Sequence, residues 1–196
     1  MNHSRRALAI VAPALLLVAL SGCSLLSTQD AEPTTGVPAC VPGHTWSTDL
    51  KDLDAQLTAY LTKHGLPTAT VVSTGSQTLE WPDSDKVKLT TDYTTVVSVP
   101  NVDGTVVTKI TEVHKGPASG IIYLNGPIAV PRDWDDSAFK MTATADINGT
   151  ATEPLPFAVP ETVLNDEVAL DVTCDGKSMT MLAHGALVTI KWDRTK

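Results

Sequence analysis

The chain has 196 residues with 22 acidic and 14 basic side chains, so its formal net charge at pH 7 is −8. This length is enough to bury a sizeable hydrophobic core. The excess of negative charge argues against nucleic acid and anionic lipid head groups as partners, because both would be repelled.

The first 23 residues have the features of a bacterial export signal. Arg5 and Arg6 make a short positive start, and an apolar run follows over residues 7–20. This run is shorter than the ~20 apolar residues that a membrane-spanning helix needs. It ends in Leu20-Ser21-Gly22-Cys23, which resembles the lipobox of bacterial lipoproteins.

The resemblance implies that lipid is attached to the thiol of Cys23 and that the signal is cut just before this residue. The mature chain would then keep 174 of the 196 residues, and its net charge would be −10, because residues 1–22 hold two basic and no acidic side chains. We therefore expect a protein that is lipid-anchored to the outer, extracytoplasmic face of the cell membrane. The alternative is an ordinary thiol at Cys23 behind an ordinary secretory signal.

The expected organisation has three parts. Residues 1–22 are the lipoprotein signal peptide, and residues 23–39 are a lipidated, flexible tether, because they are mostly polar, contain two prolines and show no sustained period. Residues 40–196 are a single extracytoplasmic domain.

Cys40 and Cys174 remain once Cys23 is assigned to lipid. Two cysteines in an exported protein usually form a disulfide, so we expect this pair to be bonded. The alternatives are two free thiols or a metal site, which would need further ligands nearby.

The clearest helical pattern lies between Ser47 and His64. Apolar residues recur there at helical spacing and make one face, at Leu50, Leu53, Leu57, Tyr60 and Leu61. Ser47 or Thr48 can cap the start, and Gly65 ends the pattern.

After Pro67 the chain is rich in Val and Thr, with frequent turn residues, which is typical of strands. The predicted strands cover 68–73, 86–90, 93–99, 105–113, 120–124, 139–147, 168–174, 177–183 and 186–192. Short connections between them indicate antiparallel pairing. The predicted fold is therefore α+β and mainly β, with one N-terminal amphipathic helix packed on an antiparallel sheet or a β-sandwich.

The strand over 139–147 shows the most regular alternation. Its odd-numbered residues should face the core and its even-numbered residues the solvent; the predicted core residues are Phe139, Met141, Ala143, Ala145 and Ile147.

The search for catalytic motifs is mostly negative. Ser137-Ala138-Phe139-Lys140 fits the Ser-x-x-Lys of penicillin-binding proteins, but it runs into a strand pattern and the other motifs of that family are missing or out of order. The histidines are widely spaced and none pairs with a second ligand in the local sequence. We expect no cofactor and no metal.

Two loop-like segments combine tryptophan with carboxylates. Asp133, Asp135 and Asp136 surround Trp134, and Trp81 precedes two further aspartates. A solvated acidic turn is the simplest interpretation, and burial against the sheet is the simplest one for each Trp. The alternatives are a calcium site or a sugar-binding site with an aromatic platform.

These observations favour a non-enzymatic, membrane-anchored module that binds an envelope protein, a wall component or a small ligand, or serves in envelope assembly. The alternative is a cell-envelope hydrolase with a site assembled from the loop carboxylates.

Overall fold

The computed structural model describes residues 36–82, 85–101, 103–104, 107–153 and 168–196. Cys23, the predicted signal peptide and most of the predicted tether lie outside these ranges. The described part of the chain is mainly β, as predicted, with ten strands and two helices. Neither of these helices is long and apolar enough to cross a membrane.

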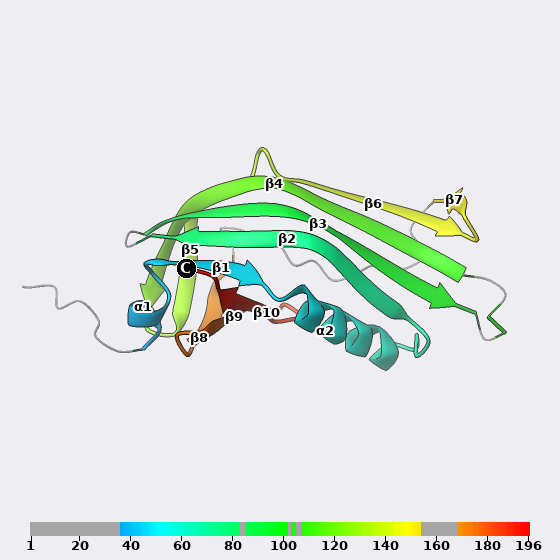
Figure 1. Cartoon of the computed structure of the whole chain (residues 1–196), viewed down its shortest axis with the longest axis horizontal. Coiled ribbons are helices and arrows are strands. Elements are labelled where there is room, and N and C mark those ends of the chain that lie inside the picture. Colours follow the sequence, from blue (N-terminus) through cyan, green and yellow to red (C-terminus); the bar gives the residue numbers. More distant parts are fainter. Residues whose placement is uncertain (1–35, 83–84, 102, 105–106, 154–167) are drawn as a thin grey trace, which may run out of the picture. The chain divides into compact units, whose positions relative to one another are not determined.

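The elements follow one another in the order shown in Figure 1. They are α1 (Val37–Cys40), β1 (His44–Thr48), α2 (Leu50–Lys63), β2 (Thr70–Trp81), β3 (Lys86–Pro100), β4 (Val107–Asn125), β5 (Ile128–Asp135), β6 (Lys140–Ile147), β7 (Thr150–Thr152), β8 (Leu170–Cys174), β9 (Ser178–Ala183) and β10 (Ile190–Arg194).

All pairings between the described strands are antiparallel, and the strands form one sheet in the order β3-β2-β1-β10-β9-β8-β5-β4-β6-β7. β3 also pairs with β4 along its whole length, so eight strands close into a ring. β6 and β7 continue the sheet beyond β4. One antiparallel sheet, rather than two stacked sheets, is therefore the observed form of the predicted β fold.

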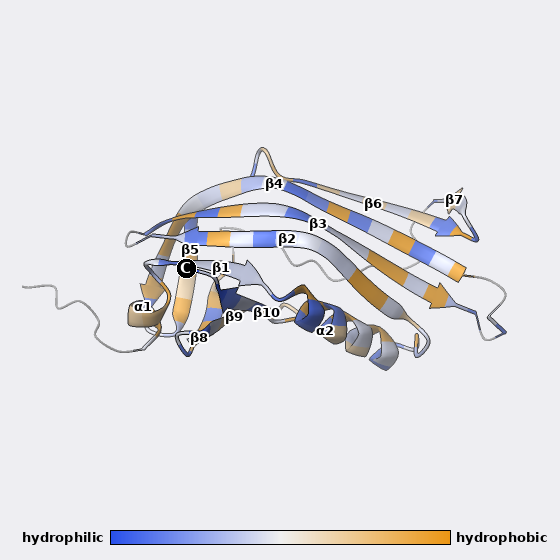
Figure 2. Cartoon of the chain, in the orientation of Figure 1, coloured by the Kyte–Doolittle hydropathy of each residue, from blue (hydrophilic) through white to orange (hydrophobic). Residues whose placement is uncertain are grey.

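The core lies on the inner face of this ring, where side chains alternate with outward-facing polar ones. Figure 2 shows the alternation of hydrophobic and hydrophilic residues along β3 and β4. Trp46 on β1 and Trp192 on β10 are fully buried, as expected from the sequence, and so is Trp81 at the end of β2. Burial of such large aromatic side chains contributes strongly to stability.

α2 lies within the interval where the sequence predicted a helix. Its apolar side buries Leu53, Leu57 and Leu61, and it packs on β2 and β10. The cap is Asp49 rather than Ser47 or Thr48, since those two residues belong to β1.

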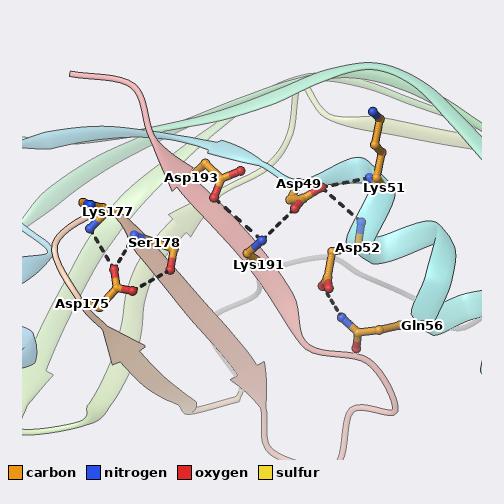
Figure 3. Close-up of polar contacts among 9 residues, drawn as sticks. All are labelled: Asp49, Lys51, Asp52, Gln56, Asp175, Lys177, Ser178, Lys191 and Asp193. Carbon is orange, nitrogen blue, oxygen red and sulfur yellow. Dashed lines mark hydrogen bonds and ion pairs between the residues drawn. The ribbon is translucent and has the colours of Figure 1, made fainter.

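Asp49 also joins the helix to β10 (Figure 3). Its carboxylate accepts hydrogen bonds from the backbone N–H groups of Lys51 and Asp52, at 3.2 and 3.1 Å. It also accepts one from the Lys191 ammonium, at 2.9 Å. These interactions, above all the hydrogen bond from Lys191, lower the pKa of Asp49.

A disulfide joins Cys40 to Cys174, which confirms the predicted pair. It connects α1 to the end of β8. α1 begins at Val37, within the segment predicted as the tether, and the Val37 side chain packs on the core.

Several predicted strands are longer in the structure. The segments 86–90 and 93–99 are one strand, β3, and the segments 105–113 and 120–124 both belong to β4. The predicted antiparallel pairing is present in the hairpin between β3 and β4 and in the C-terminal meander of β8, β9 and β10. β1, β5 and β7 were not predicted.

The predicted core face of β6 is wrong for most of its residues. Only Ala145 is buried, whereas Met141 and Ile147 are 42% and 41% exposed. The alternation correctly identified which side chains share a face, but most of that face is not covered.

We expect loss of the disulfide to be strongly destabilising, because the bond closes a loop with a sequence separation of 134 residues. The chain-entropy model gives a loss of about 5 kcal/mol in the free energy of unfolding. Urea unfolding of the double variant Cys40→Ser/Cys174→Ser should show this loss. An unchanged unfolding midpoint would contradict it.

Asp49→Asn should lower the unfolding midpoint at pH 7, because Asn keeps a capping oxygen but loses the charged contact with Lys191. Since the pKa of Asp49 is lowered from 3.8, its stabilisation is present above that value and is lost as the pH falls through the folded-state pKa. The difference from the parent chain should therefore shrink below about pH 4. Asp193→Asn is the control, because Asp193 lies 4.0 Å from Lys191 and is exposed. A difference between Asp49→Asn and the parent that is the same at every pH would contradict the assignment.

Candidate functional site

A band of polar side chains crosses the inner face of β2, β3 and β4. The strand register sets the inner side chains in rungs, each made of neighbours on successive strands. In order along the sheet, the rungs are Val71–Val97–Ile110–Ala145, Ser73–Thr95–Glu112–Ala143, Gly75–Tyr93–His114–Met141, Gln77–Thr91–Gly116 and Leu79–Leu89–Ala118. The first and last rungs are apolar. We call the side chains that the three rungs between them contribute on β2, β3 and β4 the polar band.

Many members of the polar band bond to one another. The hydroxyl groups of Ser73 and Thr95 lie 2.8 Å apart. Gln77 donates to the Thr91 hydroxyl at 3.1 Å and accepts from the Thr48 hydroxyl at 2.8 Å. Burial of these groups costs little because they satisfy one another.

His114 is the centre of the band and is only 3% exposed. Its ring stacks on Tyr93, with centroids 4.5 Å apart and an interplanar angle of 11°, and Phe139 lies 6.4 Å away. The Nε2 atom lies 3.5 Å from Oε2 of Glu112, which is also buried. The Nδ1 atom is buried and has no hydrogen-bond partner among the described residues.

The position of the Glu112 carboxylate indicates which ring nitrogen of His114 carries the proton. A negative oxygen beside Nε2 favours the tautomer with the proton on that atom, and we assign it so. In the neutral imidazole, Nδ1 is then a bare acceptor. An unpaired buried acceptor costs free energy, so a bound group that donates to it would be favoured.

Asp54 of α2 adds a second acceptor of this kind. Its Oδ2 atom accepts a hydrogen bond from the backbone N–H of Ser73 at 3.0 Å. Its Oδ1 atom is buried, again with no partner in the described part of the chain. Ser73 lies in the same rung as Glu112 but two strands away, which is roughly 10 Å across the sheet.

Two glycines allow the backbone to approach closely beside this band. Gly75 and Gly116 have φ values of 112° and 125°, which L side chains rarely adopt. A Cβ atom at Gly75 would collide with the Asp92 carbonyl oxygen, and one at Gly116 with that of Ala138. Glycine is therefore required on both sides of the Tyr93–His114 stack.

An apolar surface continues the inner face from His114 onto β6. We call it the β6 shelf, and it comprises Phe139, Met141, Ala143 and Ile147. Met141 is the cross-strand neighbour of His114, and Ala143 that of Glu112. Both are exposed, so a buried polar pair borders an open apolar surface on adjacent strands.

The residues predicted as a site from the sequence lie elsewhere. Asp133, Asp135 and Asp136 are exposed at the end of β5 and in the turn after it. Hydrogen bonds from the side chain and the backbone N–H of Ser137 lower the pKa of Asp135. In the described ranges, no group of three or more His, Cys, Asp or Glu side chains could hold a metal ion.

The two tryptophans of the predicted site do not form an exposed platform. Trp81 is 1% exposed and belongs to the core. Trp134 is half-buried and packs over Gly120 of β4, where a Cβ atom would collide with its ring. Burial against the sheet, the simplest interpretation of each Trp, is therefore confirmed for Trp81, and the alternative of an exposed stacking surface is wrong for it.

Sequence reasoning missed Glu112 and His114. The predicted strand ended at residue 113, so the histidine was left outside it. The sequence did contain a pattern that could have identified this pair. A Glu-x-His spacing within a strand places both side chains on one face.

In comparisons of sequence and fold, the chain matched no protein-family profile, no curated protein sequence and no solved structure.

Glu112→Leu should lower the free energy of unfolding by about 1–3 kcal/mol, because it leaves both nitrogens of the buried His114 ring unpaired. The double variant Glu112→Leu/His114→Phe keeps the aromatic stack and should be close to the parent, since replacing both partners of a buried polar pair by apolar groups can be nearly neutral. Urea unfolding measures both.

Glu80→Leu is the control for this pair of variants, because Glu80 is exposed and its contact with Lys88 at 3.8 Å is solvated. A double variant as unstable as Glu112→Leu alone would show that the polar pair itself stabilises the fold.

Proposed function

We propose that the chain is an exported lipoprotein, anchored by lipid on Cys23 to the outer face of the cell membrane. Residues 20–23 support this proposal, because they fit the lipobox at the end of a short apolar run. The disulfide between Cys40 and Cys174 also supports it, since such bonds persist in oxidising compartments.

The domain, in this proposal, is a non-enzymatic binding module whose ligand site is the β6 shelf with the adjoining polar band. The rung that contains His114 and Met141 is the observation that supports this proposed ligand site. His114, whose buried Nδ1 atom has no partner, is the cross-strand neighbour of Met141, which is 42% exposed. Such a combination of a few polar groups with apolar surface is typical of ligand sites.

The loop carboxylates give no support to hydrolysis, the alternative function. A general acid in a hydrolase needs a raised pKa so that it holds its proton near neutral pH. The pKa of Asp135 is lowered instead, by hydrogen bonds from Ser137. Asp133 and Asp136 are as exposed as ordinary surface residues.

The membrane anchor predicts a distinct behaviour for each cysteine variant. In cells fed an alkyne-bearing fatty acid, the parent chain should be labelled and should sediment with membranes. Cys23→Ser should lose the label, because the acceptor thiol is gone. Cys40→Ser is the control and should keep it. Equal labelling of Cys23→Ser and the parent would overturn the anchor assignment.

A further inference from the structure

We infer that a pocket at the end of β10 binds a phosphate group. The pocket has a volume of about 340 Å³ and lies between the turn that joins β8 to β9 and the last residues of β10 with those that follow. We call it the basic pocket, and its lining residues are Gly176, Lys177, Arg194, Thr195 and Lys196. It shares no residue with the β6 shelf, so the inference goes beyond the proposed function.

The charge of this lining is opposite to that of the whole chain. Three of the five residues carry a cation and none is acidic, although the net charge of the chain is −8. No ion pair joins Lys177, Arg194 or Lys196 to an acidic side chain of the described residues. Salt screens charges that lie more than about 8–10 Å away. An anion in the basic pocket would therefore interact mainly with these cations and not with the distant carboxylates.

The two carboxylates that neighbour the pocket in the sequence are engaged by other groups (Figure 3). Asp175 accepts hydrogen bonds from the backbone N–H groups of Lys177 and Ser178, at 2.8 and 2.7 Å. Asp193 lies 4.0 Å from Lys191. It follows Lys191 by two residues on β10, so both side chains lie on the face opposite to that of the next residue, at position 194. Neither carboxylate belongs to the lining.

The backbone that carries the cations is held in place by the sheet. The N–H group of Arg194 donates to the carbonyl oxygen of Lys177 at 2.8 Å, and that of Thr195 donates to the carbonyl oxygen of Thr45 at 2.8 Å. The guanidinium of Arg194 also donates from Nη1 to the carbonyl oxygen of Gly176, at 3.2 Å. Because Arg194 is positioned before a ligand arrives, less ordering is needed on binding.

The donors of the pocket suit phosphate. The Arg194 guanidinium has five N–H donors, and one of them is used by Gly176. Guanidinium groups bind phosphate oxygens through paired hydrogen bonds, and ammonium groups add point charges. A carboxylate has a single negative charge and would leave two of the three cations uncompensated. A phosphate monoester carries roughly 1.5 to 2 negative charges at pH 7 and matches them better.

The position of the pocket indicates where the phosphate could come from. Gly176 follows Cys174 by two residues, which span about 7 Å at most. Cys174 is bonded to Cys40, which directly follows the proposed tether. A head-group phosphate of the membrane is therefore one source, and this source rests on the proposed anchor. A soluble phosphate compound is the other, and the pocket itself depends on neither.

Nuclear magnetic resonance of the full chain in micelles of a neutral detergent tests the inference. Titration with inorganic phosphate at constant ionic strength should give saturable shifts of the amide signals of Gly176, Lys177 and Thr195, and chloride should give none. A second titration adds phosphatidylglycerol to the micelles. Shifts of the same amides would identify the head group as a ligand, and their absence would identify a soluble one.

Two double variants that remove the same charge give a matched comparison. Lys177→Gln/Arg194→Gln should raise the Kd for phosphate roughly tenfold or more, because two charge-assisted contacts are lost. Lys51→Gln/Lys140→Gln changes exposed residues elsewhere and should leave the Kd within about twofold of the parent. Lys196→Gln, whose side chain bonds to no described residue, should raise the Kd about threefold without a change in the fold.

The outcomes separate this pocket from the proposed function. Without saturable shifts at the three amides, or with equal shifts from phosphate and chloride, the inference fails. Equal weakening by the two double variants would also overturn it, because net charge and not the pocket would then control binding. Neither titration involves the β6 shelf or the thiol of Cys23, so a failure here leaves the proposed function standing.

Discussion

The pairing of β3 with β4 is the contact on which the rest of the structure depends. It runs without interruption from Lys86 opposite Ile121 to Pro100 opposite Val107. It closes the ring of eight strands, and it leaves the second edge of β4 free for two strands in succession. β5 uses residues 119–125 of that edge and β6 uses residues 108–115. The same strand therefore supports the core at one end and the open β6 shelf at the other.

Two buried atoms in and beside the polar band, Nδ1 of His114 and Oδ1 of Asp54, cost free energy because they have no hydrogen-bond partner. The rungs of Val71 and Leu79, on either side, show that this face can be apolar throughout. Mutual hydrogen bonds such as Ser73–Thr95 could fix the strand register, because a slip by one residue would break them. That explanation does not extend to Nδ1 of His114 or Oδ1 of Asp54, which gain nothing from the register they occupy. Their presence is better explained by something that binds there.

The sequence allowed prediction of the features that depend on local pattern. The β3–β4 hairpin, the C-terminal meander and the disulfide pair follow from turn residues, alternation and cysteine count. The break predicted in β4 was wrong because Gly116 and Pro117 are turn formers in most settings, whereas here they remain in register with Thr91 and Thr90.

Burial was harder to predict than secondary structure, because a pattern identifies a shared face and not what covers it. Met141 and Ala145 have the same parity on β6, yet only Ala145 is buried. β5 was missed for a related reason, since acidic residues at its end and Pro131 within it obscure a strand whose start packs in the core. The site itself depends on cross-strand neighbours, so no local pattern could have placed Met141 beside His114.

The proposed anchor would hold the proposed binding site close to the membrane. α1 begins at Val37, so residues 24–36 would separate the lipidated cysteine from the folded sheet. Even fully extended, a segment of this length spans about 45 Å at most. A site held so close to a bilayer meets the components of the membrane surface at a high effective concentration. A modest affinity would then be enough for occupancy of the β6 shelf, whose Met141 and Ile147 side chains are exposed.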